Sequence, residues 1–218
     1  MSVDNTASSS LKKQAGSFND LTVGYVIKSD KRNRRFMPTD GSILSFKQNL
    51  PVVADSRSVL NSFSYRTYHS FSENVIGALK LYGAAVTSIG DDDVRLSKRL
   101  NLGRTHLRGF EGGKVGPRDG ADYVGGNYAT ALNLEAALPN LLPESTETDI
   151  SVFMDVANLW HVDYSSEVDD SNKIRSSIGV ATNLYTPIGP LNFVFAQDLS
   201  SAESDTTQQF KFQIGTSF

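Results

Sequence analysis

Apolar and polar residues alternate along most of the chain after its first twenty residues. In the segment 126–138, for example, Leu132 and Leu134 alternate with Asn133 and Glu135. A period of two places successive side chains on opposite faces of a β-strand. The pattern predicts about nine strands, at residues 21–28, 42–52, 58–71, 74–90, 126–138, 149–160, 172–185, 190–199 and 209–218.

The length and the faces of these strands are typical of a membrane barrel. They reach roughly ten residues, whereas strands of soluble sheets usually have about five or six. Their polar face carries many Gly, Ala, Asn and Ser residues, as a crowded lumen would. Short turns such as 186–190 alternate with a loop as long as 91–124, and the chain ends on Phe218. The pattern favours an all-β, antiparallel transmembrane β-barrel, with a soluble antiparallel sandwich as the alternative.

Composition narrows the classes of function. The 218 residues contain no cysteine, which excludes disulfides and thiolate metal sites, and the net charge of −3 gives no reason to expect nucleic acid as a partner. Residues 1–19 are rich in Ser, Asn, Thr and Lys and are expected to form a loop or an irregular N-terminal end, whereas residues 20–218 hold the strands.

A glycine-rich loop, HLRGFEGGKVGPRDG (106–120), resembles a phosphate-binding loop at first sight. It fails that pattern, because Arg108 and Val115 occupy the positions where a P-loop needs a glycine and a Ser or Thr. The three histidines are too far apart in sequence to suggest a ligand pair, and no nucleophile and base stand together. The sequence therefore predicts no catalytic residue, no cofactor and no metal site.

Six segments, in order and spacing, carry a resemblance to one family. The chain resembles the C-terminal part of the BamA-type outer-membrane assembly factors, whose periplasmic POTRA domains precede a β-barrel. The family signature V/I-R-G-F/Y appears as Leu107-Arg108-Gly109-Phe110, with Leu107 in place of the commoner Val, and Ala157 replaces the glycine of F-x-D-x-G. The segments are SDKRNRRFMPTDGS, LSKRLNLGRTHLRGFEGGKVGPRD, VGGNYATALNLEAALP, FMDVANLW, IRSSIGVATNLYTPIGPLNFVFAQDL and QQFKFQIGTSF.

The resemblance implies that the long loop folds back into the lumen, where Arg108 meets the carboxylates of Glu135 and Asp155. The alternation of residues independently places both acids on the polar faces of neighbouring strands, where a guanidinium could bond both. Glycines such as Gly109 would let the backbone turn in a narrow space, with Phe110 as an apolar contact. We expect this set to be an architectural latch rather than a catalytic site.

The last strand is the second candidate site. The resemblance implies that it opens as a lateral gate and pairs with strands of client proteins, and Gly215 would weaken its ladder. The alternative is that the strand is only the signal for the barrel's own assembly. The residues concerned are Phe210, Phe212, Gly215 and Phe218.

The resemblance also sets the expected function and partners. It implies an outer-membrane assembly factor that inserts β-barrel proteins without covalent chemistry, acting on unfolded barrel clients within outer-membrane lipid. Assembly lipoproteins would bind through POTRA domains that this chain lacks. The chain corresponds to roughly the second half of the family's barrel, so we expect a partial barrel. Alternatives are a TamA-like protein, a two-partner secretion transporter, a passive channel or an outer-membrane enzyme.

Overall fold

The computed structural model describes residues 12, 16–90, 92–143, 148–166, 168, 172–186 and 189–214. Most of the predicted irregular segment 1–19 and the last four residues lie outside this set. The strands of the main sheet are β1 (Asp20–Asp30), β2 (Gly41–Ala54), β3 (Ser58–Ser72), β4 (Val75–Ser88), β7 (Tyr128–Leu138), β8 (Thr148–Trp160), β9 (Arg175–Thr186), β10 (Gly189–Ser200) and β11 (Phe210–Ile214).

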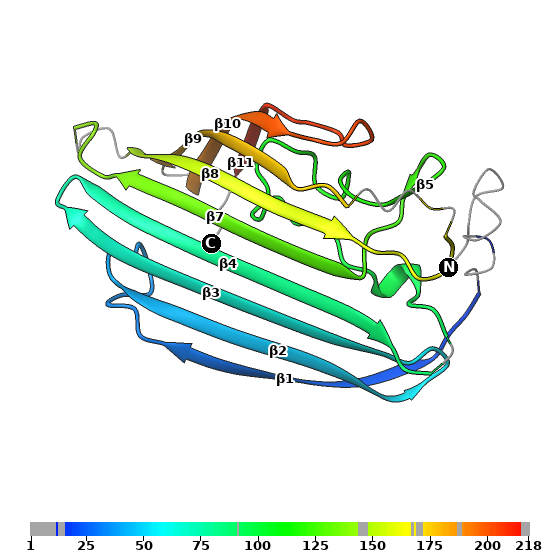
Figure 1. Ribbon diagram of the computed structural model, residues 1–218. Helices are drawn as coiled ribbons and strands as arrows, with labels where there is room; N and C mark the ends of the chain where they lie inside the picture. The colour runs from blue at the N-terminus through cyan, green and yellow to red at the C-terminus, as the bar shows by residue number, and fades with distance from the viewer. Residues whose placement is uncertain are drawn as a thin grey trace.

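These nine strands form one antiparallel sheet whose spatial order follows the sequence. The sheet is strongly curved, like a trough (Figure 1). It is not closed: within the described residues, β1 and β11 each pair on one side only. The predicted all-β partial barrel of about nine strands is therefore confirmed. No helix in the described part of the chain is long and apolar enough to cross a membrane.

The register of the strands separates an outward face from an inward face. Leu79, Leu134, Met154 and Ile178 lie directly opposite one another on β4, β7, β8 and β9 and are partly exposed. The next inward row contains Asp155, which is fully buried. Adjacent residues thus point to opposite faces, as the alternation predicted.

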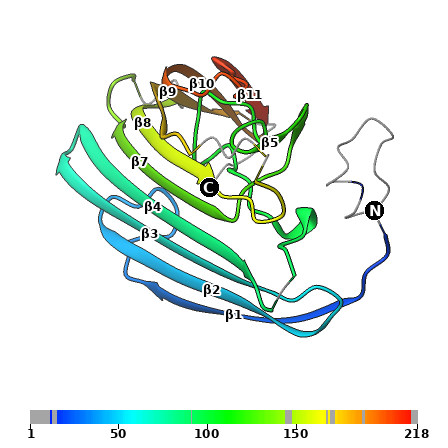
Figure 2. The ribbon, with the colours of Figure 1, turned by 45° about the vertical axis from the view of Figure 1, so that its right-hand side comes forward.

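The residues between β4 and β7, which we call the lumen loop (89–127), lie on the concave side of the sheet (Figure 2). They include the 3-10 turn η1 (Leu96–Lys98) and the short strands β5 (Arg118–Asp119) and β6 (Asp122–Tyr123). The predicted loop, residues 91–124, lies within the segment between β4 and β7. Strand β7 begins at Tyr128 rather than at residue 126, because Gly126 forms a bridge with Leu100 inside the loop.

The lumen loop packs through apolar side chains on the concave face of the sheet, where most of the sheet side chains are small. Leu107 and Phe110 of the loop are almost fully buried, together with Leu102 and Val115. Three of the four sheet residues at this point are alanines, so the loop can approach the sheet closely. The cluster contains Leu102, Leu107, Phe110, Val115, Ala129, Ala131, Ala157 and Leu159.

Candidate functional site: the anchored lumen loop

Arg108 joins the lumen loop to two carboxylates of the sheet. Its Nε and Nη2 donate to the two oxygens of Asp155 over 2.8 and 2.7 Å, and its backbone N–H donates to Asp155 Oδ2 over 2.9 Å. Its Nη1 donates to Glu135 Oε2 over 2.9 Å. The Asp155 side chain has no exposed surface, so these charge-assisted bonds replace the water that it loses on burial.

Strand register explains why one guanidinium reaches both acids. Glu135 lies opposite Phe153, and Asp155 lies opposite Asn133, which makes the two acids diagonal neighbours on the lumen face of β7 and β8. The Arg108 Cζ also lies 3.5 Å from the centroid of the Phe153 ring, within cation–π range. Arg108 is therefore held by ion pairs with two acids and by a cation–π contact with Phe153.

The residue after Arg108 must be a glycine. Gly109 has φ +87°, and a Cβ added to it would lie 3.0 Å from the Cβ of Ala196 on β10. The loop backbone is held against the wall at the same point, because Ser177 Oγ donates a hydrogen bond to the carbonyl of Arg108. A side chain at Gly109 would push the Arg108 backbone away from the sheet.

A second buried arginine, Arg99, closes the base of the lumen loop. It forms an ion pair with Asp163 in the connection between β8 and β9, and its side chain has no exposed surface. Its Nη1 donates to Asn127 Oδ1 and its Nη2 donates to the Val94 carbonyl, each over 2.7 Å. The two ends of the loop are therefore tied to each other and to that connection.

A third buried arginine, Arg175 on β9, pairs with Asp205 in the connection between β10 and β11. The Arg175 Nε donates to Asp205 Oδ2 over 2.9 Å and its Nη2 donates to Oδ1 over 3.1 Å, and neither side chain is exposed. The Arg175 Nη1 donates to Asn158 Oδ1 over 3.0 Å. Asp205 also accepts the N–H of Gly116 in the lumen loop over 3.3 Å.

The sequence predicted the first of these three arginine–carboxylate pairs, that of Arg108, but not those of Arg99 and Arg175. The structure brings Arg108, Glu135 and Asp155 together, with Leu107, Gly109 and Phe110 around them. The alternation placed Arg175 on the polar face of a predicted strand. A buried cation needs a counter-ion, so this position was a signal that Arg175 pairs with an acid. Asp163 and Asp205 could not be paired from sequence, because each lies in a connection whose inward fold no strand pattern encodes.

The pKa values of Asp163 and His106, beside and in the lumen loop, both lie below their ordinary values. Burial raises the pKa of Asp163, but the Val94 N–H and the Arg99 guanidinium outweigh it and hold the pKa below its ordinary value. For His106, burial lowers the pKa, and the charge of Arg66 adds to the effect. The His106 ring stacks on Tyr82 with 4.1 Å between centroids, and the neutral ring is the favoured form.

The candidate gate residues on the terminal strand are only partly described. Phe210 and Phe212 lie on the outward face of β11, where they contact Phe195 and Phe193 of β10 with ring centroids 4.8 and 5.1 Å apart. Both are nearly half exposed. Gly215 and Phe218 lie outside the described residues, so the predicted weak point of the strand has no structural description.

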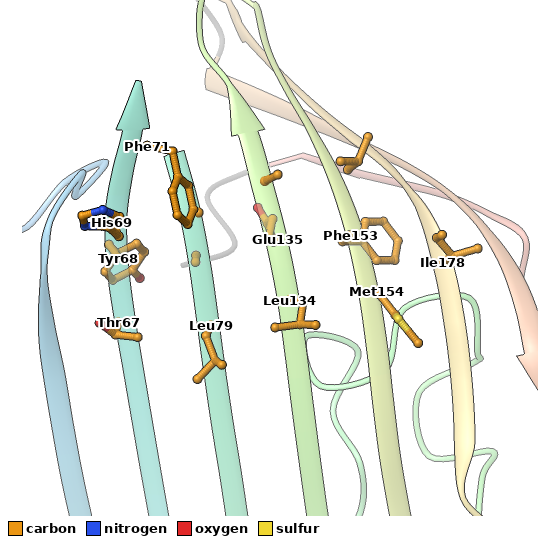
Figure 3. A pocket seen from close by; sticks show the side chains of 14 residues that line it. Thr67, Tyr68, His69, Phe71, Leu79, Leu134, Glu135, Phe153, Met154 and Ile178 are labelled. Carbon is orange, nitrogen blue, oxygen red and sulfur yellow. The ribbon is translucent and has the colours of Figure 1, made fainter. Parts of the chain in front are cut away.

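The outward face carries a shallow apolar groove of about 560 Å³ near the turn between β3 and β4. Its floor includes the row of Leu79, Leu134, Met154 and Ile178, and Phe71 lies at one end of it (Figure 3). In the described ranges, no three His, Asp or Glu residues are grouped so that they could hold a metal ion. The charged groups that do lie together are Arg108 of the lumen loop and its partners Glu135 and Asp155 on the sheet.

An antiparallel sheet with an apolar convex face and a loop anchored on its concave face defines the barrel of a membrane protein with an inward-folded loop. The chain belongs to the Omp85 superfamily, whose domain matches residues 2–218. Its location is the bacterial outer membrane.

The relatives are named as outer membrane protein assembly factors and as a subunit of a sorting assembly machinery. The chain is 27% identical to the outer membrane protein assembly factor BamA of Neorickettsia risticii and 23% identical to that of Nitratidesulfovibrio vulgaris, over 99% of this chain and 30% and 28% of theirs. It is 24% identical to the sorting assembly machinery 50 kDa subunit of Saccharomyces cerevisiae, over 97% of this chain and 46% of that protein. This chain thus spans less than a third of the two BamA relatives.

A solved structure agrees with this assignment. The crystal structure of Haemophilus ducreyi BamA lacking POTRA domains 1–3 matches with a TM-score of 0.78 and 26% identity, over 88% of this chain and 41% of that one. The recognition as the C-terminal barrel portion of a BamA-type factor is therefore confirmed.

Proposed function

We propose that this chain is part of the barrel of an outer-membrane assembly factor that folds and inserts β-barrel proteins. The observation that carries the proposal is the lumen loop, which is fixed to the wall by Arg108, Glu135 and Asp155. A passive channel gives no reason for a loop that is held against the sheet by matched buried charges. The relatives, which are named as an outer membrane protein assembly factor and a sorting assembly machinery subunit, support the same conclusion.

The proposed mechanism uses scaffold and edge rather than covalent chemistry. The Arg108 latch holds the loop, and thereby the barrel, in its working state. The terminal strand β11 opens as a lateral gate, and client strands add to its free edge through main-chain hydrogen bonds. Partners are unfolded barrel clients, the surrounding lipid, and assembly lipoproteins bound by POTRA domains elsewhere in the full-length protein.

The test is depletion of the full-length protein, followed by the heat-modifiable migration of several unrelated outer-membrane barrels. Broad loss of folded barrels is the expected result. Normal barrels with one trapped secreted partner would indicate a two-partner transporter, and no defect of either kind would return the assignment to a channel.

Complementation with Arg108→Ala tests the latch itself. This variant leaves Asp155 buried without its guanidinium, so barrel assembly is expected to fall and the protein's own heat stability to drop. Arg104→Ala is the matched control, because Arg104 is an exposed cation of the same loop. Equal client insertion and heat stability in both variants would contradict the latch.

A further inference from the structure

The connection between β10 and β11 (residues 201–209) pairs with the lumen loop. The Glu111 N–H donates to the Thr206 carbonyl over 2.9 Å, and the Gln208 N–H donates to the Gly109 carbonyl over 2.8 Å. This short antiparallel bridge ties the residues beside Arg108 to the residues that lead into β11. Further contacts are Thr206 N–H to the Lys114 carbonyl, 2.9 Å, and Tyr123 hydroxyl to the Ser204 carbonyl, 2.6 Å.

Asp205 contacts three parts of the molecule, which are strand β9, the lumen loop and its own connection between β10 and β11. Its carboxylate receives the fork of Arg175 from the wall, the Gly116 N–H from the loop and the Ala202 N–H from its own connection. The side chains of both members of the ion pair have no exposed surface. A fully buried pair with this many bonds is specific in geometry, since any displacement leaves a charge without a partner.

The bridge uses the backbone edge that β11 leaves free. The Ala196 N–H of β10 donates to the Gln209 carbonyl, so the polar groups of Gln209 face β10. Polar groups alternate in direction along an antiparallel strand, and those of Thr206 and Gln208 therefore belong to the opposite edge. Gln209 lies at a bend between these residues and β11, whose other edge pairs with no strand within the described residues.

We propose that Arg175 and Asp205 form a second latch, which couples the lumen loop to the terminal strand and sets the length of its free edge. While the latch is closed, the loop occupies the edge at Thr206–Gln208, and an added strand can pair only from Phe210 onward. When the latch opens, the edge is lengthened by these residues. This inference rests on the proposed addition of client strands to β11.

Hydrogen exchange in the full-length protein tests the coupling without any client. Asp205→Asn keeps the size of the side chain but removes the charge that Arg175 binds. The amides of Glu111, Thr206 and Gln208 are expected to exchange at least about tenfold faster, while those in the middle of β7 and β8 stay unchanged. Glu203→Gln, an exposed acid of the same connection, is the control. Unchanged exchange at the three amides would overturn the latch.

Crosslinking to a client tests the second latch and the proposed strand addition separately. Cysteines at Gln208 and, separately, at Phe212 are crosslinked to a cysteine in the terminal strand of a stalled barrel client. Asp205→Asn should increase the Gln208 crosslink several-fold and leave the Phe212 crosslink unchanged. If Phe212 fails to crosslink, strand addition itself is wrong. If Phe212 crosslinks while Gln208 does not respond to Asp205→Asn, the second latch is wrong.

Two further variants test the coupling in proteins that keep the Arg175–Asp205 ion pair, so that an effect on the crosslink is not a result of misfolding. Tyr123→Phe removes the hydroxyl contact with the connection and leaves no buried charge, so it should raise the Gln208 crosslink more weakly in a folded protein. Conversely, a disulfide between Phe110→Cys and Thr207→Cys, which form a bridge pair, should abolish that crosslink. The Phe110→Cys single variant controls for lost packing. A Gln208 crosslink that persists in the disulfide-locked protein would overturn the proposal.

Discussion

At the scale of single residues, Arg108 depends on shape as well as charge. Two of its side-chain nitrogens bond the two oxygens of Asp155, a third bonds Glu135, and the central carbon of the group lies over the Phe153 ring. A lysine carries the same charge but offers neither a fork nor a flat surface.

Arg108→Lys is therefore expected to be intermediate. Relative to the wild type, it should lose about 1–3 kcal/mol of stability, because the charge of Asp155 remains partly compensated. Arg108→Ala should lose more, about 3–5 kcal/mol. Denaturant unfolding of the full-length protein in detergent measures both. A lysine variant as stable as the wild type would show that charge alone holds the loop.

His106 and Asp163 make the docking of the loop dependent on pH. Both pKa values lie below the ordinary ones, so the folded state binds fewer protons than the unfolded state, and stability falls as pH falls. The loss begins below the ordinary histidine pKa of 6.5 and continues below the ordinary carboxyl pKa of 3.8 as the folded-state values are passed. Arg66 and Lys80 oppose the charged ring and Asp155 favours it.

His106→Phe should remove the first part of this dependence. A phenyl ring can still stack on Tyr82 but cannot accept a proton, so the stability lost between pH 7 and pH 5 should be smaller than in the wild type. The measurement is the unfolding midpoint at the two pH values, with the exposed His69→Phe as the control. Equal loss in His106→Phe and the wild type would exclude the histidine as the source.

At the scale of elements, the lumen loop depends on glycines that differ in their surroundings. Gly113 and Gly116 both have positive φ, at +76° and +98°. A Cβ at Gly116 would lie 2.8 Å from Leu159 on β8, whereas a Cβ at Gly113 would have nothing within 4 Å. Both positions thus need a positive φ, which favours glycine, and they differ in their contact with the sheet.

Alanine at the two positions separates these effects. Gly113→Ala should cost about 1 kcal/mol from the strained backbone alone. Gly116→Ala should cost more and should also increase exchange of the Gly116 amide, because Leu159 and Asp205 both lie at that point. Unfolding and hydrogen exchange of the full-length protein provide the comparison. Equal effects would mean that the loop tolerates displacement from β8.

The same elements show what the sequence could predict. Strict alternation on β7 and β8 fixed which face holds Glu135 and Asp155, because strand side chains have a period of two. Element boundaries were accurate to a few residues. The lumen loop has no such period, so its path, and the meeting of Arg99 with Asp163 and of Arg175 with Asp205, follows from packing between segments distant in sequence. Pattern alone cannot supply that information.

At the scale of the whole molecule, the sheet separates lipid from lumen. On β10, Phe195 is 58% exposed, while its neighbours Val194 and Ala196 are each 7% exposed beneath the loop and its surroundings. An apolar face of this extent would be unfavourable in water but suits a bilayer. Within the described residues, β1 and β11 each have one unpaired edge, which would be costly in lipid, and the solved relative extends well beyond this chain.

Site-directed labelling of β10 in the full-length protein tests this orientation. Spin labels on cysteines at Phe193 and Phe195 should respond to oxygen dissolved in the bilayer, whereas labels at Asn192 and Val194 should be shielded from it. The response should therefore alternate with a period of two along the strand. In a soluble sandwich the apolar face would be buried, and labels at Phe193 and Phe195 would be shielded from lipid and water alike. That result would contradict a membrane barrel, and with it the gate and both latches, since each requires the loop to lie inside and the bilayer outside.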